Sequence, residues 1–375
     1  MKKILLLGIF DSTYIVHFIN DILIPLEYEV YIMPDTKDIN NKFIDNPHLH
    51  IVYSLKKNSK NPILRKLSSI KKVFSDIKTL KKIGGFDFIH IHYVSYKALF
   101  IASKIKKHCN SKLLLTYWGS DILRDVDNEI NKNRKYLKNV DYFSSDSLTT
   151  KLAFNKTYRN KYDLEVVYFG DSICTEIDKL NRNSVLDYKK EFNIPENKTI
   201  VTIGYNARPA QQHLQVINAL INSKLNFEDF YFILPMTYCK EDLVYIENLK
   251  NTLKNNNLNY LIFESYLSDT QIGKLRLISD IFINAQTTDA FCNTVKEFFY
   301  LGKTIFNPTW LDYPEFKEWD LKTISYSDFS ELPSKLIHYS EILSKEQLNS
   351  NSNFFKNKMS WENCKDAWEK IYNSL

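Results

Sequence analysis

The chain has 375 residues, of which 44% are hydrophobic and 25% charged, a composition typical of a globular protein with room for two domains. Its net charge of +6 is too small for this length to indicate a nucleic-acid partner, and none is expected. Five cysteines without C-x-x-C spacing argue against a zinc site or a disulfide framework and favour a reducing cytoplasm.

The first half of the sequence alternates apolar runs with segments of helical periodicity. The first run stops at Asp11 without a small-residue cleavage site, so we expect a strand there and not a signal peptide. No run approaches the roughly 20 residues that span a membrane. Alternating strands and helices predict a parallel, doubly wound sheet. The expected strands are 3–9, 28–33, 49–53, 86–92, 112–117, 140–145 and 164–169.

A basic segment occupies residues 54–83, where ten Lys or Arg residues accompany a single acid, Asp76. Apolar residues recur in it at helical spacing from Ile63 to Leu80. A basic amphipathic helix of this kind can lie on an anionic membrane surface. It can equally pack on the sheet and keep its lysines in solvent.

Several polar residues follow the expected strands of the first half, where ligands of a parallel sheet bind. Asp121 can accept a proton or bind a sugar hydroxyl, and the alternative is that it caps the next helix. Gly119 permits a close approach of the backbone. His90 and His92 are expected to point to opposite faces of their strand, so that only one of them, His92, faces the ligand. Asp11 follows the first strand and is a further candidate for contact with a substrate.

Residues 171–198 are polar and predict a connection between two domains. A second alternation of strands and helices follows, and the segment 353–375 is expected to be helical. We therefore expect an N-terminal domain at 1–175, a C-terminal domain at 190–355 and a final helix at 356–375. The expected strands of the second half are 199–204, 230–235, 259–263, 280–285 and 303–306.

The sequence G-Y-N-A-R-P-A-Q-Q-H at 204–213 follows a strand and opens a helix, so its loop lies at the ligand edge of the sheet. Arg208 can neutralise a diphosphate through bidentate hydrogen bonds. Gly204 and Gln211 belong to the same expected substrate-binding loop. The alternative is a surface arginine beside the turn-forming Pro209.

The segment 280–307 contains a buried strand, a polar loop, a helix and a further strand. Asp289 in the loop and Glu297 in the helix lie eight positions apart. Carboxylates at a helix start can bind ribose hydroxyls or stabilise positive charge at an anomeric carbon. The backbone N–H groups of Asn293 and Thr294 can hold a diphosphate. The alternative is a capping box, in which Glu297 bonds back to the backbone at Thr294.

Taken together, these motifs resemble the GT-B glycosyltransferases, and above all the retaining family that carries an E-x7-E motif. Asp289 matches the first acid of that motif and Glu297 the second. The resemblance implies an α/β fold with two Rossmann-like domains whose parallel sheets face a central cleft, and a C-terminal helix that crosses back to the N-terminal domain. The matching segments follow the family's order along most of the chain, namely F-D-F-I-H-I-H-Y, L-L-L-T-Y-W-G-S-D-I, I-V-T-I-G-Y-N-A-R and D-A-F-C-N-T-V-K-E-F-F-Y-L-G-K.

This resemblance implies metal-independent transfer of a hexosyl group from a nucleotide sugar to a glycan or lipid-linked oligosaccharide, in the synthesis of bacterial surface polysaccharides. It implies that Asp289 lies near the donor sugar, Glu297 on the nucleotide ribose and Arg208 near the diphosphate. The N-terminal domain would bind the acceptor, and no cofactor is expected besides the donor. The enzyme is expected in the cytoplasm, peripheral to the inner face of the cell membrane.

The sequence departs from the family pattern at some of these positions. The first acid is Asp, and Gln211 stands near the place of a usual Lys. The run at 204–213 is also similar to the bacterial lipid-linked 4-acetamido-fucosyl transferases, which invert. With retention Asp289 would stabilise the oxocarbenium ion, whereas with inversion Asp121 or Asp11 would be the base. A nucleotide-sugar 2-epimerase and a non-catalytic partner subunit of the same fold stay open as alternatives.

Overall fold

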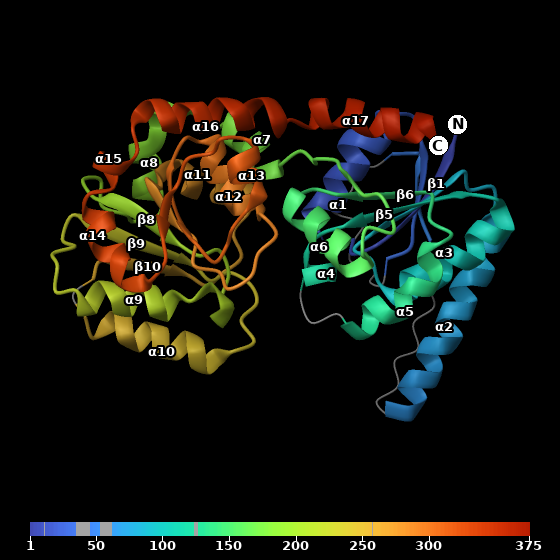
Figure 1. Cartoon of the computed structure of the whole chain (residues 1–375), viewed down its shortest axis with the longest axis horizontal. Helices are drawn as coiled ribbons and strands as arrows, with labels where there is room; N and C mark the ends of the chain where they lie inside the picture. The colour runs from blue at the N-terminus through green and yellow to red at the C-terminus, as the bar shows by residue number, and fades with distance from the viewer. Residues whose placement is uncertain (11, 35–45, 53–61, 124–126, 257) are drawn as a thin grey trace. The chain divides into compact units, whose positions relative to one another are not determined.

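The structure of the protein is a computed structural model that describes residues 1–10, 12–34, 46–52, 62–123, 127–256 and 258–375, without the side chains of 62–67 and 127. Contacts divide the chain into two compact units. The first unit comprises Met1–Gly170 together with Trp361–Leu375, and the second comprises Asp171–Ser360. Each unit has a parallel β-sheet with helices on both of its faces (Figure 1).

The first unit contains a seven-stranded sheet with the order β3-β2-β1-β4-β5-β6-β7. The order of the chain reverses between β1 and β4, which is where parallel sheets form ligand crevices. The strands are β1 (Lys3–Leu7), β2 (Glu29–Ile32), β3 (Leu49–Ile51), β4 (Phe88–His92), β5 (Lys112–Tyr117), β6 (Tyr142–Ser145) and β7 (Glu165–Val166). The helices are α1 (Thr13–His17), η1 (Phe18–Leu23), α2 (Pro62–Ile83), α3 (Tyr96–Cys109), α4 (Ser120–Leu123), α5 (Asp127–Leu137), α6 (Leu148–Tyr158) and α17 (Trp361–Ser374).

Both faces of this sheet are buried, as the continuous apolar runs in its strands indicate. Leu5 and Leu7 of β1 pack into the core beneath α2 and α3. Ile4 and Leu6 point the other way, into a second core that contains Trp368 of α17. The alternation of side chains along β1 therefore divides the apolar residues of one strand between two helical layers.

Helix α17 completes the core of the first unit, although it is formed by the last residues of the chain. Trp368 is fully buried, and its ring centroid lies 5.1 Å from that of Phe18 in η1 and 5.2 Å from that of Phe169. The hydroxyl of Tyr372 shares a hydrogen bond of 2.7 Å with Nδ1 of His90. The helix is thus held by both apolar packing and a buried polar contact.

The prediction that His90 and His92 point to opposite faces is wrong. Residues two positions apart in a strand share a face, and the two imidazole rings lie 4.1 Å apart, both beside Phe18. Both histidines are fully buried. Burial lowers the pKa of His90 to about 3, and burial together with His90 lowers the pKa of His92 well below its usual value. His92 is therefore a neutral residue of the core, and its ring nitrogens have no hydrogen-bond partner among the described residues.

The second unit contains a six-stranded parallel sheet with the order β10-β9-β8-β11-β12-β13, which reverses between β8 and β11. The strands are β8 (Thr199–Ile203), β9 (Phe230–Pro235), β10 (Tyr260–Phe263), β11 (Ile281–Ile283), β12 (Thr304–Pro308) and β13 (Ile324–Tyr326). The helices are α7 (Ser172–Lys179), η3 (Arg182–Ser184), α8 (Val185–Glu191), η4 (Pro209–Gln211), α9 (His213–Asn222), α10 (Leu243–Lys254), α11 (Asp269–Ile278), α12 (Asn293–Tyr300), α13 (Pro314–Glu318), η5 (Phe329–Glu331), α14 (Leu332–Ile337), α15 (Tyr339–Ile342) and α16 (Lys345–Lys358).

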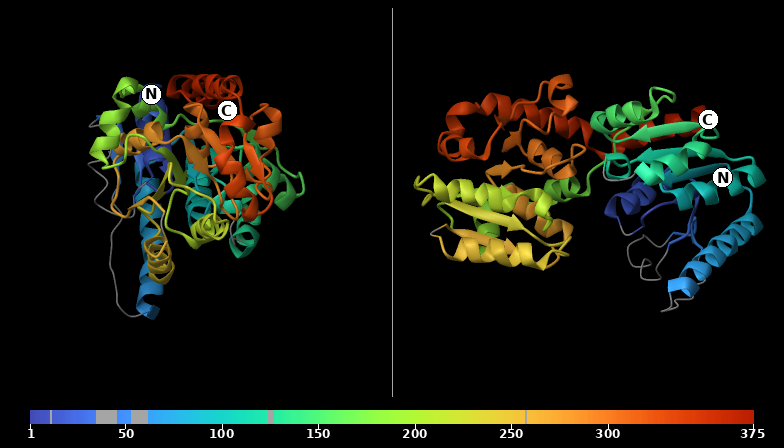
Figure 2. Two further views of the ribbon diagram at one scale, coloured as in Figure 1. Left: turned by 90° about the vertical axis from the view of Figure 1, so that its left-hand side faces the viewer. Right: turned by 60° about the horizontal axis from the view of Figure 1, so that its bottom comes forward.

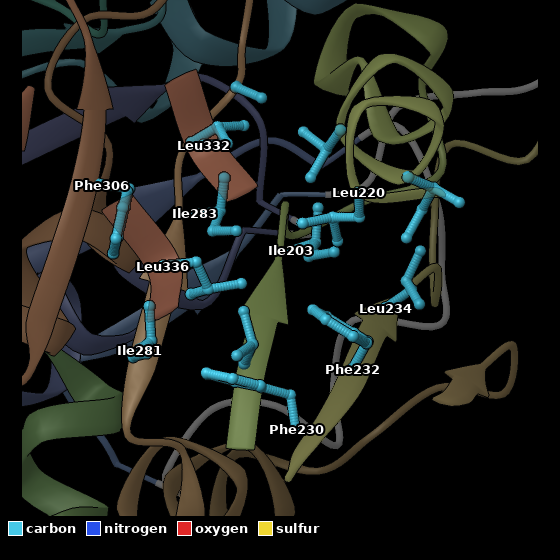
Figure 3. Packing of buried hydrophobic residues seen from close by; sticks show 14 of the residues in the cluster. Ile203, Leu220, Phe230, Phe232, Leu234, Ile281, Ile283, Phe306, Leu332 and Leu336 are labelled. Atoms are coloured by element: carbon cyan, nitrogen blue, oxygen red, sulfur yellow. The ribbon is translucent and has the colours of Figure 1, made fainter. Parts of the chain in front are cut away.

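The two central strands of this sheet are anchored by apolar packing on one face. Figure 3 shows Ile203 of β8 and Ile283 of β11 beside Leu220 of α9 and the pair Leu332 and Leu336 of α14. All five side chains are buried within one cluster. This packing fixes the two strand ends that carry the candidate site.

Three features of the second unit differ from the sequence-based expectation. The segment 171–198, which was expected to connect the domains, contains α7 and α8, and both helices pack against α11 within the unit. The edge strand β13 was not expected, since its run I-S-Y has only three residues. The final helix expected at 356–375 begins later, at Trp361 of α17, because Met359 and Ser360 separate it from α16.

We expect Trp368→Ala to destabilise the first unit by about 3–5 kcal/mol, because it removes the largest side chain of a closed aromatic core and leaves a cavity. Denaturant-induced unfolding followed by near-ultraviolet circular dichroism measures the loss. Glu369→Ala, at an exposed position of the same helix, is the matched control and should change stability by less than about 0.5 kcal/mol. Equal stability of the two variants would contradict the burial of Trp368.

Candidate functional site

Two loops meet at the carboxyl ends of β8 and β11, the neighbouring strands at which the second sheet reverses. The first loop covers 204–212 and the second covers 284–292. The N–H of Gly204 donates to the carbonyl of Ile283 (3.2 Å), and the N–H of Thr287 donates to the carbonyl of Ala210 (2.9 Å). Nε2 of Gln212 donates to the carbonyl of Ala285 (2.6 Å). These bonds join the two loops into one surface at the ligand edge of the sheet.

Asp289 is half-buried in the second loop and is held by three donors. The Tyr313 hydroxyl (2.6 Å) and the backbone N–H of Cys292 (2.9 Å) donate to Oδ2, and the Tyr205 hydroxyl (3.4 Å) donates to Oδ1. Burial, with a contribution from the charge of Asp289, raises the pKa of both tyrosines well above the usual value. Both phenols therefore stay protonated near neutral pH, and they hold the carboxylate in one orientation.

Helix α12 begins at Asn293, with Cys292 as its N-cap residue. The alternative of a capping box between Thr294 and Glu297 is therefore not realised. Instead, Oε2 of Glu297 accepts a hydrogen bond of 2.7 Å from Nε of Arg276, and Nη2 of Arg276 lies 3.3 Å from Oγ1 of Thr294. Glu297 is 3% exposed. The second acid of the pair thus lies in a buried ion pair one turn inside the helix.

Asn293 and Glu297 also lie close to Asp171, which caps helix α7. Nδ2 of Asn293 donates to Oδ2 of Asp171 (3.0 Å), and Oδ1 of Asp171 accepts from the N–H of Cys174 (2.9 Å). Burial and then the charge of Glu297 raise the pKa of Asp171 to about 7. Two acids therefore share the buried region beneath the start of α12, with Lys296 and Arg276 as the neighbouring cations.

The predicted residues of the first loop have different environments. Arg208 is exposed, and its guanidinium makes no hydrogen bond to the described part of the chain. Gly204 has φ of +64°, and a Cβ added there would lie 2.6 Å from Nε2 of His213 and 2.9 Å from Oε1 of Gln211. Gln211 is fully buried and accepts from the N–H of Tyr205 (3.2 Å). Gly204 and Gln211 thus shape the loop that presents Arg208.

The predicted residues of the first unit gather after β4 and β5. Asp121 is 6% exposed, and its two carboxylate oxygens accept from the N–H groups of Trp118 (3.0 Å) and Val94 (2.9 Å). Burial raises the pKa of Asp121 to about 7. Gly119 has φ of +81°, which permits the turn between β5 and α4. Asp121 therefore joins the loops that follow β4 and β5. Asp11 lies outside the described residues.

Sequence reasoning missed three residues that contact the predicted ones. Tyr205 lies next to Gly204 in the motif, so its position was the only available signal. Tyr313 contacts Asp289 from 24 positions away, and Arg276 contacts Glu297 from 21 positions away. No local pattern marks such pairs, because the fold brings them together.

Within the described ranges, His, Cys, Asp and Glu form no cluster of three or more that could hold a metal ion. Among the described helices, none combines the length and hydrophobicity needed to cross a membrane. The candidate site consists of Asp289 and Glu297, the loop 204–212 that carries Arg208 (the arginine loop) and the start of α12.

The pKa of Asp171 predicts a pH dependence of stability. It lies at about 7 in the folded protein against 3.8 for an ordinary Asp, so the folded state holds this proton more tightly. Stability contributed by this group is therefore lost as the pH rises from about 4 to about 7. Asp171→Asn keeps an oxygen that can cap α7, and we expect it to flatten this decline by about 1 kcal/mol or more in denaturant titrations. The exposed Asp229→Asn is the control, and an Asp171→Asn profile identical to it would contradict the prediction.

Residues 3–151 match the family model described as glycosyl transferase 4-like. A comparison with curated protein sequences gives no significant match. Among solved structures, a glycosyltransferase from Rickettsia africae aligns over 100% of this chain and 98% of its own, with a TM-score of 0.77 and 18% identity. Anabaena HepE in complex with UDP-glucose aligns over 100% of both chains, with a TM-score of 0.72 and 14% identity.

The UDP-GlcNAc 2-epimerase from Neisseria meningitidis, bound to UDP-GlcNAc, aligns over 96% of this chain and 99% of its own. Its TM-score is 0.59 and its identity 14%. These likenesses and the two parallel sheets confirm the expected fold class. The chain therefore has the GT-B fold of glycosyltransferases, and its first 151 residues are similar to the glycosyl transferase 4-like family.

Proposed function

We propose that the chain is a glycosyltransferase that moves a hexosyl group from a nucleotide sugar to a glycan or lipid-linked acceptor, with retention, in bacterial surface polysaccharide synthesis. The observation that carries the proposal is the edge formed by β8 and β11. There the acid Asp289, the arginine loop and the start of α12 are joined by hydrogen bonds. The GT-B fold supports the assignment of this edge to the donor.

The start of α12 supplies groups suited to the donor diphosphate. The N–H groups of Asn293 and Thr294 bind no other group in the described part of the chain, and they stand at the positive end of the helix dipole. Arg208 is exposed on the neighbouring loop and can form two hydrogen bonds with the same anion. These charges can stabilise the leaving diphosphate, so we propose transfer without a metal ion.

Asp289 is the proposed catalytic carboxylate of the donor site. In the transfer, the bond between the anomeric carbon and the diphosphate oxygen breaks, and the acceptor oxygen bonds to the same face of the sugar. The acceptor proton passes to the leaving phosphate oxygen. The carboxylate of Asp289, held by Tyr205 and Tyr313, would stabilise the positive charge that develops on the sugar.

We further propose that the first unit binds the acceptor. A cavity of about 260 Å³ lies at the carboxyl ends of β1 and β4, where that sheet reverses, and Gly8, Tyr93, Ser95 and Lys97 are among its lining residues. Gly8 is required there, because a Cβ would lie 2.6 Å from the carbonyl oxygen of His92. Since Asp121 bonds to backbone on both oxygens, the geometry favours a role in shaping this edge.

The exposed face of α2 supports a location on the membrane surface. Helix α2 lies along α3 (Figure 1, Figure 2), and Ile77 and Leu80 are buried on its inner side. At the margin of this helix Phe74 is 59% accessible beside the exposed Lys71 and Lys78, and its ring centroid lies 6.3 Å from that of Phe100 of α3. Exposed aromatic and basic residues on one helix face suit an anionic bilayer surface. Residues 54–61 of the basic segment lie outside the described residues.

Nucleoside diphosphates should stabilise the protein, because a ligand that binds only the folded state raises its melting temperature. We expect one of UDP, dTDP, GDP and ADP to stabilise the wild type by about 2–3 kcal/mol at a hundredfold excess over its Kd. Arg208→Ala should weaken this binding at least about tenfold, because it removes a charged partner of the diphosphate. Arg182→Ala, at the surface of the same unit, is the control. Absence of a shift with all four nucleotides would contradict the proposed donor site.

The identity of the products tests the reaction. Incubation with a nucleotide sugar and an acceptor lipid should yield a glycoside with the donor's anomeric configuration, which proton NMR detects. Asp289→Asn should reduce kcat by about a hundredfold or more, since it removes charge stabilisation in the transition state. A new free nucleotide sugar formed from donor alone would indicate an epimerase, and nucleotide binding without turnover would indicate a non-catalytic subunit.

Vesicle sedimentation tests the membrane face. The protein should bind vesicles of phosphatidylcholine that contain roughly 30% phosphatidylglycerol. It should bind pure phosphatidylcholine poorly, and it should dissociate from the anionic vesicles as the salt concentration rises. The double variant Lys71→Glu, Lys78→Glu should bind at least about tenfold more weakly, because each basic residue contributes about 1 kcal/mol near such a surface. Lys254→Glu, on α10 of the other unit, is the control. Equal binding of both variants would contradict the assigned face.

A further inference from the structure

Arg276 is a buried cation that no sequence motif marked. It is on α11, its side chain is 6% exposed, and its guanidinium lies over the ring of Phe298 at 5.2 Å. Nε donates to Glu297 and Nη2 to Thr294. Nη1 has no hydrogen-bond partner in the described structure. Arg276 therefore connects α11 to the first two turns of α12 through three different groups.

The ion pair between Arg276 and Glu297 is expected to add little net stability to the packing of α11 against α12. Both side chains are more than nine-tenths buried, and the desolvation of two charges largely offsets their attraction. Apolar residues of similar volume often give equal or greater stability at such positions. A role in fixing geometry explains the pair better than a role in stability.

The geometry that the pair fixes is that of the Glu297 carboxylate. Oε2 is held by Arg276, whereas Oε1 has no hydrogen-bond partner among the described residues. Glu297 is the fifth residue of α12, so it lies one turn from the N–H groups proposed to bind the diphosphate. A carboxylate with one fixed oxygen and one open oxygen suits an acceptor of hydrogen bonds from a vicinal diol.

The neighbouring charges show why a cation is needed at this place. Asp171 lies close enough to Glu297 for the two charges to interact, and both acids are buried. Like charges in a buried region disfavour ionisation. Lys296 acts on Asp171, and Arg276 bonds Glu297 directly, so each acid has a cation beside it. Arg276 thereby places a positive charge directly against the carboxyl group of Glu297.

We propose that Arg276 is the positioning residue of the donor site, which orients Glu297 so that its free oxygen accepts hydrogen bonds from the nucleotide's ribose hydroxyls. The proposal rests on the proposed function and deepens it. Arg276 would set the preference for a nucleotide with ribose hydroxyls over one without them. Arg208 and the start of α12 would set the affinity for the diphosphate.

Affinities measured by isothermal titration calorimetry test this assignment. The probes are the tightest binder among the ribonucleotides UDP, GDP and ADP, its analogue without ribose 2′ and 3′ hydroxyls, and inorganic diphosphate. The wild type should prefer the hydroxylated nucleotide roughly tenfold or more, since the hydroxyls bond to a charged group. In Arg276→Met the ratio of the two nucleotide affinities should fall to about two or less. The affinity for inorganic diphosphate should stay unchanged.

Three further variants keep the test decisive if Arg276→Met folds poorly. Glu297→Gln should lose the ratio to the same extent. The double variant Arg276→Met, Glu297→Gln leaves no unpaired charge and should match Glu297→Gln, because Arg276 acts through Glu297. Arg276→Lys should give an intermediate ratio. Lys274→Met, on the same helix as Arg276, removes a surface ion pair with Glu191 of α8; it is the matched control and should keep the wild-type ratio.

The outcomes separate this inference from the proposed function. If the wild type binds no nucleoside diphosphate, the proposed function fails and the inference fails with it. If the wild type binds one and Arg276→Met or Glu297→Gln keeps the wild-type ratio, only the inference is overturned. An equal loss of affinity for both nucleotides and for inorganic diphosphate would also overturn it, since Arg276 would then contact the anion itself.

Discussion

The parallel pairing of β8 with β11 is the constraint on which the candidate site depends. The two strands are far apart in sequence but adjacent in the sheet, and their carboxyl ends lie at the same edge. The loops that follow must therefore meet, and backbone bonds such as Thr287 to Ala210 join them. Apolar packing of Ile203 and Ile283 holds the strand ends beneath (Figure 3). The polar groups of the edge are thus positioned by apolar packing beneath them, together with Tyr326 of the same core, whose hydroxyl donates to the carbonyl of Asn284 (2.6 Å).

The parts of the fold that could be predicted are those that leave a local record. The central strands of both sheets are buried on both faces, so their apolar runs stand out against polar helix surfaces. The break between α16 and α17 is not marked by glycine or proline, because Met359 and Ser360 stand there, and apolar residues such as Phe355 and Trp368 occur on both sides of it. The opposite placement expected for His90 and His92 failed for a simpler reason, since a strand repeats every two residues.

The same distinction between local and long-range signals applies to the residues of the candidate site. The positions of Asp289, Arg208 and the start of α12 could be predicted because they lie in the segments that follow β8 and β11, and strand ends are where ligands bind. Their roles toward a ligand stay predictions. The contacts of Tyr313 and Arg276 could not be predicted, because each reaches its acid from an element more than 20 positions away. The residues expected to meet the substrate are therefore local to the loops, and the residues that orient them come from the surrounding fold.

The exposed Arg208 and the fixed acids Asp289 and Glu297 differ in the entropy that ligand binding would cost them. Arg208 is exposed and free to rotate, so ordering it on a ligand costs up to about 2 kcal/mol of side-chain entropy, which offsets part of the attraction it gains. Asp289 and Glu297 are already fixed by tyrosine and arginine donors, so binding needs little further ordering of them. In the proposed donor site, attraction of the anion and orientation of the sugar and ribose would thus fall to different groups. Arg208 would follow the leaving diphosphate, whereas Asp289 and Glu297 would hold the two rings in place.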